Sequence, residues 1–391
     1  MLGLRRLPAK SYQAFVKLLV KWTPQLVQLL TAAFRQRMKQ RFPRRLRVAG
    51  FWVFGADGSR LELPRTESNE AAYSPCAKRS GKRKRNRRKQ PSNKSHTKKA
   101  NAPQVWITTL WHLGTQLPWS WRLGPSDSSE REHLREMLGE LPPNALLVAD
   151  TGFPGYELWS ELLKAGHELV MRVGGNVRLL KNLGYVRRGE DIVYFWPDRA
   201  ASKRQPPLIL RLVVLTGGRQ PIYVLTSVLD HKRLPNRQVV NLYHLRWGIE
   251  LFYRHLKQTF DRRKLRSRNG DNVHVEAQWS LLGLWAMALH AQHYQQAQRI
   301  DPARLSVAGM LRAYRRALRE YKSRPEAGED LYSLLALAIK DNYQRASRKT
   351  SRDYPRKKKQ TAAGPPQIVR ATAAQIKLAA DIQREQKRLT A

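Results

Sequence analysis

The sequence predicts a chain of mixed α/β (α+β) class, in which a strand-rich middle lies between helical ends. The run ALLVAD at 145–150 is continuously apolar, as in a strand buried on both faces, and a helix and another strand follow it. Residues 174–230 show four strand patterns separated by Gly, Pro and basic turns. Apolar residues recur at helical spacing before residue 45 and again after residue 236.

The elements of the first third follow in order from these patterns. Residues 8–42 are expected to be helical, with Pro24 inside the pattern. Residues 46–66 favour a strand, and the Asp57-Gly58 pair could turn it into a second strand. The segment VWITTLWHL at 105–113 is expected to be a strand.

A helix is expected at 128–141, with Ser128 or Ser129 as its N-cap. The segment 154–173 predicts a helix that stops at Gly166 and a strand after it. The last elements are helical, and a basic tail follows them; these helices are expected at 236–260, 273–297, 303–321 and 328–347.

The charge of the chain points to a polyanionic partner. It has 73 Lys and Arg against 30 Asp and Glu, for a formal net charge of +43. Twelve of the 22 residues at 78–99 are Lys or Arg, which predicts a mobile loop that contacts phosphates or is simply solvated. Nucleic acid is the polyanion that such a surface attracts through counterion release, either for chemistry or for simple coating.

Cysteine usage and hydropathy indicate where the protein works. Cys76 is the single cysteine, which excludes an intrachain disulfide and a cysteine-based zinc site. No signal-peptide core is evident, and the run SLLGLWAMALHA is too short to span a bilayer. We expect a cytoplasmic, nucleoid-associated protein without a membrane partner.

One face of the helix at 236–260 carries a set of side chains suited to phosphate chemistry. At about 100° per residue, Tyr243, Arg246, Glu250 and Lys257 share a narrow face beside an apolar stripe. Arg254 and Trp247 lie next to that face and are candidates for DNA contact. The alternative is a solvated face on which Arg246 and Glu250 form an (i, i+4) ion pair.

Two further acids, Asp57 and Asp150, are candidates to join Glu250 in one metal site. Each has another explanation, since Asp-Gly favours a hairpin turn and an aspartate after a strand often caps a helix. Together, however, three carboxylates are what two Mg²⁺ ions need for phosphoryl transfer. The sequence contains neither a phosphate-binding G-x-x-x-x-G-K-[ST] loop nor a G-x-S-x-G nucleophile elbow.

The spacing Tyr243-x2-Arg246-x3-Glu250-x6-Lys257 resembles the Y-R-E-K signature of the IS4 family of DDE transposases. GADGSRLELPRTESNE at 55–70 and ADTGFPGYELWSELLKAGHELVMRV at 149–173 are similar to the family's segments around its first and second aspartates. YVLTSVLD ahead of Tyr243 and YPRKKKQTAAGPPQ near the end also look like family material. The resemblance covers about residues 46–370, in order.

The resemblance implies an RNase H-like core, a mixed sheet flanked by helices, with a β-rich insertion before the helix that carries the glutamate. It makes Asp57, Asp150 and Glu250 the catalytic and metal-binding triad. It also places Tyr243, Arg246 and Lys257 near phosphates at the cleaved transposon end. Thr151 follows the second aspartate where many members carry arginine, so a phosphate contact at that position is open.

The predicted function is a DNA transposase that cleaves and joins strands at insertion-sequence ends with two Mg²⁺ ions, for which Mn²⁺ would substitute. Its expected partners are double-stranded DNA, as transposon ends and target, and a second copy of the chain in the synaptic complex. The alternatives are a non-enzymatic basic nucleic-acid-binding protein, and an RNase H-like nuclease or decayed transposase without end specificity. The expected regions are an N-terminal helical region at 1–45 that could bind DNA, a first part of the core at 46–173 with a mobile basic loop at 74–103, a β-rich insertion at 174–230, core completion with the Glu helix at 231–300, and a C-terminal helical region with a basic tail at 301–391.

Overall fold

The computed structural model describes residues 11–75, 102–185, 189–216, 220–323, 330–341 and 364–390. The basic block at 78–99 and Cys76 lie outside these ranges, as does the YPRKKK run at 354–359. None of the helices in the described ranges is both long and apolar enough to cross a bilayer.

Ten strands form a single sheet in the order β10-β6-β7-β8-β9-β5-β4-β1-β2-β3. Their bounds are β1 Trp52–Glu62, β2 Gln104–His112, β3 Leu117–Gly124, β4 Ala145–Ala149, β5 Glu168–Val173, β6 Arg178–Lys181, β7 Ile192–Phe195, β8 Leu208–Leu215, β9 Ile222–Thr226 and β10 Gln367–Arg370.

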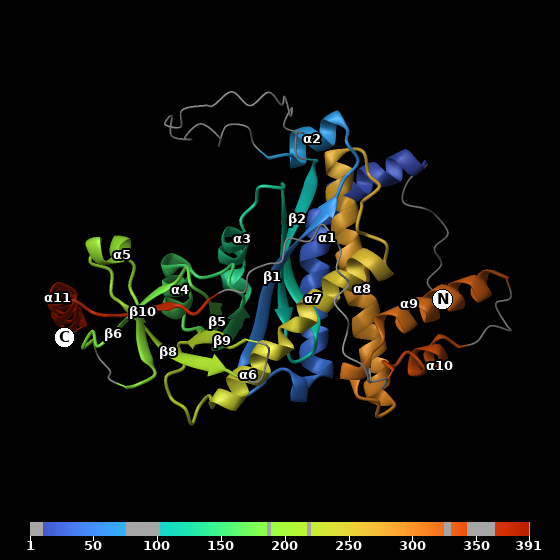
Figure 1. Ribbon diagram of the computed structural model, residues 1–391. Coiled ribbons are helices and arrows are strands. Elements are labelled where there is room, and N and C mark those ends of the chain that lie inside the picture. Colours follow the sequence, from blue (N-terminus) through green and yellow to red (C-terminus); the bar gives the residue numbers. More distant parts are fainter. Residues whose placement is uncertain are drawn as a thin grey trace.

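Helices cover this sheet and extend beyond its β3 end (Figure 1). The α-helices are α1 Tyr12–Arg41, α2 Glu67–Tyr73, α3 Glu130–Met137, α4 Tyr156–Lys164, α5 Asp198–Ser202, α6 Asn236–Leu245, α7 Trp247–Arg254, α8 Gly270–Ala297, α9 Val307–Ser323, α10 Leu331–Ala336 and α11 Ala373–Thr390. Short 3-10 turns lie at Pro43–Arg45, Leu138–Glu140 and Pro302–Arg304, and a π-helical turn at His255–Thr259.

Five strands of the sheet have the RNase H-like arrangement. Strands β1, β2 and β3 form an antiparallel meander, and β4 and then β5 add in parallel on the other side of β1. The connection from β3 to β4 runs through α3, and that from β4 to β5 through α4. The expected mixed-sheet α/β fold with an RNase H-like core is therefore confirmed.

The structure corrects the expectation of a hairpin at Asp57-Gly58. Strand β1 runs unbroken through this pair, and Asp57 and Gly58 stand opposite Thr109 and Thr108 of β2. The turn preference of an Asp-Gly pair is local. Here the nine-residue partner strand β2 pairs with β1 along this stretch, β4 pairs with β1 up to Ala56, and that pairing outweighs the preference.

The strands expected at 174–230 are present, and they continue the core sheet. Strand β9 pairs antiparallel with β5, and β8, β7 and β6 follow outward. Beyond them, β10 pairs in parallel with β6, and α11 follows it. The expectation of only a basic tail at this end is therefore wrong: the segment after residue 366 forms a strand and a helix.

Two other elements differ from the expectation. The sequence patterns did not indicate β3, because Pro118 interrupts its strand pattern; β3 is an edge strand, where proline is tolerated. The helix expected at 328–347 is shorter, since α10 ends at Ala336 and the chain then bridges Leu305 through Ile339. Residues 342–350 lie outside the described ranges.

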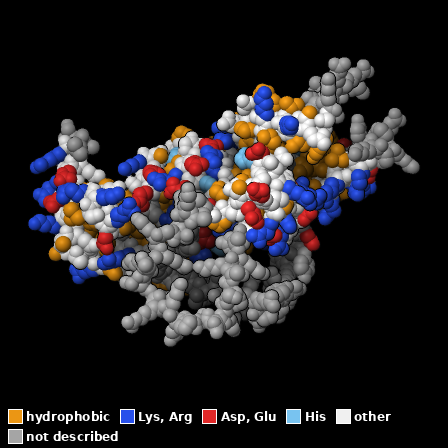
Figure 2. All heavy atoms as spheres, turned by 90° about the horizontal axis from the view of Figure 1, so that it is seen from above, with side chains coloured by type: hydrophobic (Ala, Val, Ile, Leu, Met, Phe, Trp, Pro, Cys, Tyr) orange, Lys and Arg blue, Asp and Glu red, His pale blue; other side chains and the backbone are white. Residues whose placement is uncertain are grey.

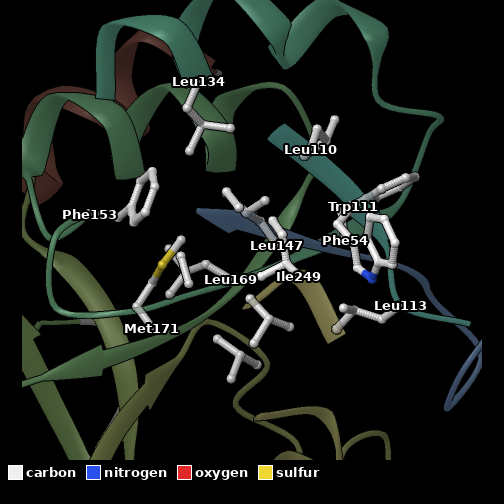
Figure 3. Close-up of a cluster of buried hydrophobic side chains, with 14 of the residues drawn as sticks. Phe54, Leu110, Trp111, Leu113, Leu134, Leu147, Phe153, Leu169, Met171 and Ile249 are labelled. Atoms are coloured by element: carbon white, nitrogen blue, oxygen red, sulfur yellow. The ribbon is translucent and has the colours of Figure 1, made fainter. Parts of the chain in front are cut away.

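The helix expected at 236–260 is nearly continuous. Arg246 separates α6 from α7 but keeps helical dihedrals, and Ile249 N donates to Arg246 O at 3.0 Å. Ile249 is fully buried and lies among the strand side chains of the core, including Phe54 and Leu147 (Figure 3). Burying such a side chain stabilises by about 1.5–3 kcal/mol, so this contact anchors α7 beneath the sheet.

Candidate active site

The two aspartates lie on neighbouring parallel strands at the same level. The register pairs Ala56 of β1 with Ala149 of β4, so Asp57 and Asp150 are the next residues on the two strands. Asp57 remains within β1, whereas Asp150 follows the end of β4 and accepts a hydrogen bond from Thr151 N at 2.7 Å. Parallel pairing thus brings together two acids that are 93 positions apart in the sequence.

Helix α7 brings Glu250 to the same place. One terminal nitrogen of Arg246 lies 3.0 Å from Glu250 Oε1 and 3.5 Å from Asp150 Oδ2. The separation of the two carboxylate oxygens therefore cannot exceed the sum of these two distances. That sum is well below the separation of roughly 10 Å at which two acids could no longer share a two-metal site. The (i, i+4) ion pair of Arg246 and Glu250 is present together with the convergence of the acids, so the two are not alternatives.

Tyr253 fixes the Glu helix to the strand of the first aspartate. Its hydroxyl donates to the carbonyl oxygen of Asp57 at 2.8 Å and lies 3.0 Å from Thr109 Oγ1. The side chain is buried, and this burial raises the pKa of Tyr253 well above its usual value. Tyr253 was not among the residues predicted from the sequence; the available signal was a polar tip on the buried side of a helix, one turn after Glu250.

Burial dominates the electrostatics of Asp57. Burial raises the pKa of its carboxyl from 3.8 to about 7. The nearby Arg246 and the backbone N–H of Gly58 act against this rise, and the carboxylates of Glu130 and Glu250 add to it. Asp57 is thus within electrostatic reach of Arg246 and Glu250, and the strand register places it beside Asp150.

Arg246 is the internal counter-ion of this group. Its side chain is only 5% exposed. Burial alone would lower the pKa of Arg246, but Tyr243 and the surrounding carboxylates outweigh that effect and raise it. The guanidinium also lies over the Tyr243 ring, 5.4 Å from its centroid.

A second arginine, Arg172, borders the site from β5. The β4–β5 register pairs Ala149 with Met171, so Arg172 stands beside Asp150, and a guanidinium nitrogen lies 3.5 Å from Asp150 Oδ1. Arg172 also acts on Tyr243: it opposes the rise in the pKa of the Tyr243 hydroxyl that burial and the charge of Asp150 cause. Arg172 was not predicted either, and the only signal for it in the sequence is a single charged residue within the buried run LVMRV.

The structure places the other candidate residues at different depths. Tyr243 is 7% exposed and lies against Arg246. Lys257 is half-buried on the π-helical turn; burial and Arg263 lower its pKa, while Glu62 and Asp57 oppose the shift. Trp247 is 53% exposed and Arg254 is also exposed, so these two are not gathered among the acids.

A fourth carboxylate, Glu130 at the start of α3, approaches the two aspartates. A Cβ added to Gly58 would overlap its carboxyl group, and one added to Gly152 would lie 3.3 Å from its Oε2. Because Gly58 and Gly152 have no side chain, they leave room for the Glu130 carboxyl group. The sequence patterns predicted the helix at 128–141 that contains Glu130, but no role for this residue.

The donor chemistry of the group fits a hard divalent cation, because carboxylate oxygens are the ligands that Mg²⁺ and Mn²⁺ prefer. Within the described ranges, no three His, Cys, Asp or Glu residues already stand in a metal-holding arrangement. Arg246 explains this for Asp150 and Glu250, since its nitrogen lies between their oxygens. A cation would have to take its place.

Comparisons with known proteins agree with the geometry. A family model described as a transposase DDE domain matches residues 53–286. Transposase InsG for insertion sequence element IS4, from Escherichia coli (strain K12), is 27% identical over 242 residues, which are 60% of this chain and 50% of that protein. The chain thus spans about half the length of this curated relative.

A solved structure, the cryo-EM structure of the piggyBac transposase synaptic complex with hairpin DNA, aligns with 75% of this chain and 59% of that chain, at 12% identity and a TM-score of 0.41. The family model covers more than half of the chain, and the curated relative is the transposase of IS4 itself. The chain belongs to the DDE transposase family and is of the IS4 type.

Proposed function

We propose that this protein is a DNA transposase that cleaves and joins strands at the ends of its own insertion element. The single observation that carries the proposal is the grouping of Asp150 and Glu250 around Arg246, with Asp57 on the next strand, in a chain of this family. Divalent ions held by these three acids, Mg²⁺ or Mn²⁺, would activate the attacking oxygen and stabilise the leaving oxygen of an in-line displacement.

The protein residues have separate roles in this proposal. Asp57, Asp150 and Glu250 supply negative oxygen ligands from a strand, a strand end and a helix. Tyr253 and Ile249 hold the helix so that the glutamate keeps its place relative to the strands. In the metal-free protein Arg246 balances the charge of two acids; once a cation does so, its guanidinium is free to bind a phosphate oxygen.

The proposed reaction has two steps of the same kind. Water attacks a phosphodiester at the element end, which breaks the bond to the 3′ oxygen and leaves a 3′-hydroxyl and a 5′-phosphate. That 3′-hydroxyl then attacks a phosphodiester of the target and displaces a second 3′ oxygen, so one bond forms for each bond that breaks. Tyr243, Arg246 and Lys257 would position the phosphates, with Arg254 and Trp247 contacting DNA farther out.

The charge of the surface supports DNA as the substrate. Lys and Arg side chains gather at several places on the face seen in Figure 2, and the whole chain carries a net charge of +43. Such a surface binds phosphates with a strong dependence on salt. Two DNA ends must be held together for joining, so we also propose a dimer in the complex with DNA.

The test is strand cleavage and joining with a duplex that carries an end of the protein's own element. We expect cleavage to require Mg²⁺ or Mn²⁺, and Asp150→Asn to lose roughly a hundredfold to a thousandfold in rate, as expected when a group that organises the transition state is removed. Asp261→Asn, which removes a surface aspartate that is 79% exposed, is the matched control and should cleave normally.

The outcomes separate the alternatives. Cleavage without joining would identify a nuclease or a decayed transposase. DNA binding without divalent-dependent cleavage would identify a nucleic-acid-binding protein. Equal cleavage by wild type and Asp150→Asn would refute the assignment of the site.

A further inference from the structure

Glu130 has no role in the proposed triad, yet its side chain reaches the same site. It is the first residue of α3, after the N-cap Ser129, whose side chain accepts a hydrogen bond from Glu132 N. Helix α3 follows β3, so a fourth element of the fold contributes an acid to the group formed by β1, β4 and α7.

Two glycines make the approach possible. The carboxyl group of Glu130 lies directly against Gly58, where any side chain would overlap it. Its second oxygen lies near Gly152, where an added Cβ would be 3.3 Å away. The carboxylate therefore fills a space between the residue after Asp57 and the loop after Asp150, the two places where the aspartates also lie.

The surroundings of the Glu130 carboxylate suit a group that binds a cation. Among the described residues, no hydrogen-bond donor or ion-pair partner at bonding distance contacts its carboxylate. Arg60 and Arg131 act on the carboxylate electrostatically without forming an ion pair with it, and the charge of Asp150 acts in the opposite sense. A partly buried carboxylate without a donor, next to two like charges, is costly unless a cation joins them.

Stabilisation of the helix start does not explain this placement. An acid in the first turn of a helix gains from the helix dipole even on the surface. Glu132 occupies the same turn of α3; its side chain is 64% exposed and pairs with Arg135. The Glu130 side chain is instead partly buried and points toward two acids, so the helix dipole does not account for its position.

We propose that Glu130 is a fourth carboxylate of this site and a ligand of a divalent ion that Asp57 and Asp150 also hold. The inference rests on the proposed function, because it assumes that the acids bind metal. It adds a residue outside the triad and predicts that one of the two ions loses a ligand when Glu130 is changed.

The test is a calorimetric titration of the full-length protein with Mn²⁺ alone, near pH 8 and without DNA. Glu130→Gln keeps the shape of the side chain and removes its charge. We expect it to weaken Mn²⁺ binding roughly tenfold or more, at least the loss that is typical for a residue that only supports a metal ligand. Glu132→Gln, in the same helical turn, should bind Mn²⁺ as wild type does.

Asp150→Asn separates failure of this inference from failure of the proposed function. If Asp150→Asn weakens Mn²⁺ binding and Glu130→Gln does not, the inference is overturned and the triad stands. If neither variant changes the titration, or wild type binds no Mn²⁺, both proposals are overturned. Circular dichroism checks that Glu130→Gln is folded; if it is not, Gly58→Ala, which displaces the same carboxylate, must show the same weakening, and wild-type binding by that variant overturns the inference.

Discussion

Replacing Asp57 by asparagine should remove a pH-dependent loss of folding stability from the metal-free protein. The carboxyl is buried, and its pKa is raised from 3.8 to about 7. Because the pKa in the folded protein exceeds that of the unfolded chain, the folded state binds the proton more tightly. The associated stability is full below about pH 4 and is lost as the pH rises through about 7.

The magnitude follows from the size of the shift. Each pKa unit corresponds to about 1.4 kcal/mol, so a rise from 3.8 to about 7 sets an upper bound of roughly 4 kcal/mol. Relaxation and water around a partly accessible carboxylate reduce such values, and we expect about 1–2 kcal/mol. Between about pH 5 and pH 8, Asp57→Asn should therefore gain this amount of stability relative to wild type.

The assay is urea unfolding of both proteins at several pH values, with a chelator present. The difference between wild type and variant removes the titration of all other groups. Asp261→Asn is the control for the loss of one aspartate carboxylate at the surface, since the Asp261 side chain is 79% exposed. A difference for Asp57→Asn that does not change between about pH 5 and pH 8 would refute the account of the buried carboxylate.

Three other substitutions test how the site is held. Tyr253→Phe removes the hydroxyl that donates to Asp57 O, and should cost about 1–2 kcal/mol in urea unfolding and slow cleavage while DNA affinity is kept; unchanged cleavage would contradict the positioning role. Gly58→Ala should displace the Glu130 carboxylate and weaken Mn²⁺ binding, whereas Gly139→Ala, where an added Cβ meets nothing within 4 Å, should not; equal titrations would count against a role for this contact. Ile249→Ala should destabilise by about 2–5 kcal/mol because the side chain is fully buried, and Leu245→Ala, on the exposed side, should cost much less; equal costs would show that α7 is not anchored through Ile249.

Much of the fold could be predicted because single strands and helices carry local patterns. The run ALLVAD became β4, and the 154–173 segment became α4, a stop at Gly166 and β5. Gly166 adopts φ +74, which glycine tolerates best, so the predicted stop has a conformational basis. The Y-R-E-K spacing likewise indicated which face of α6 and α7 meets the acids.

What could not be predicted depends on partners distant in the sequence. Asp57 lies within a strand because β2 pairs with β1 through and beyond this position, and a local turn signal cannot report that. Strand β10 exists because β6 offers an edge about 190 residues earlier. Arg172, Tyr253 and Glu130 reach the site through register and packing. Arg172 and Tyr253 lie inside the two segments that resemble the family, but neither is one of the positions that the quoted motifs mark.

The central claim is that Asp57, Asp150 and Glu250 hold divalent ions in one place. Iron-directed cleavage of the protein tests it most directly: Fe²⁺ with ascorbate and peroxide cuts the backbone near the bound ion, and mass spectrometry locates the cuts. We predict cuts close to residues 57, 150 and 250, suppressed by excess Mg²⁺ and strongly reduced in Glu250→Gln. Cuts elsewhere, or cuts at these positions that neither Mg²⁺ nor Glu250→Gln reduces, would contradict the account.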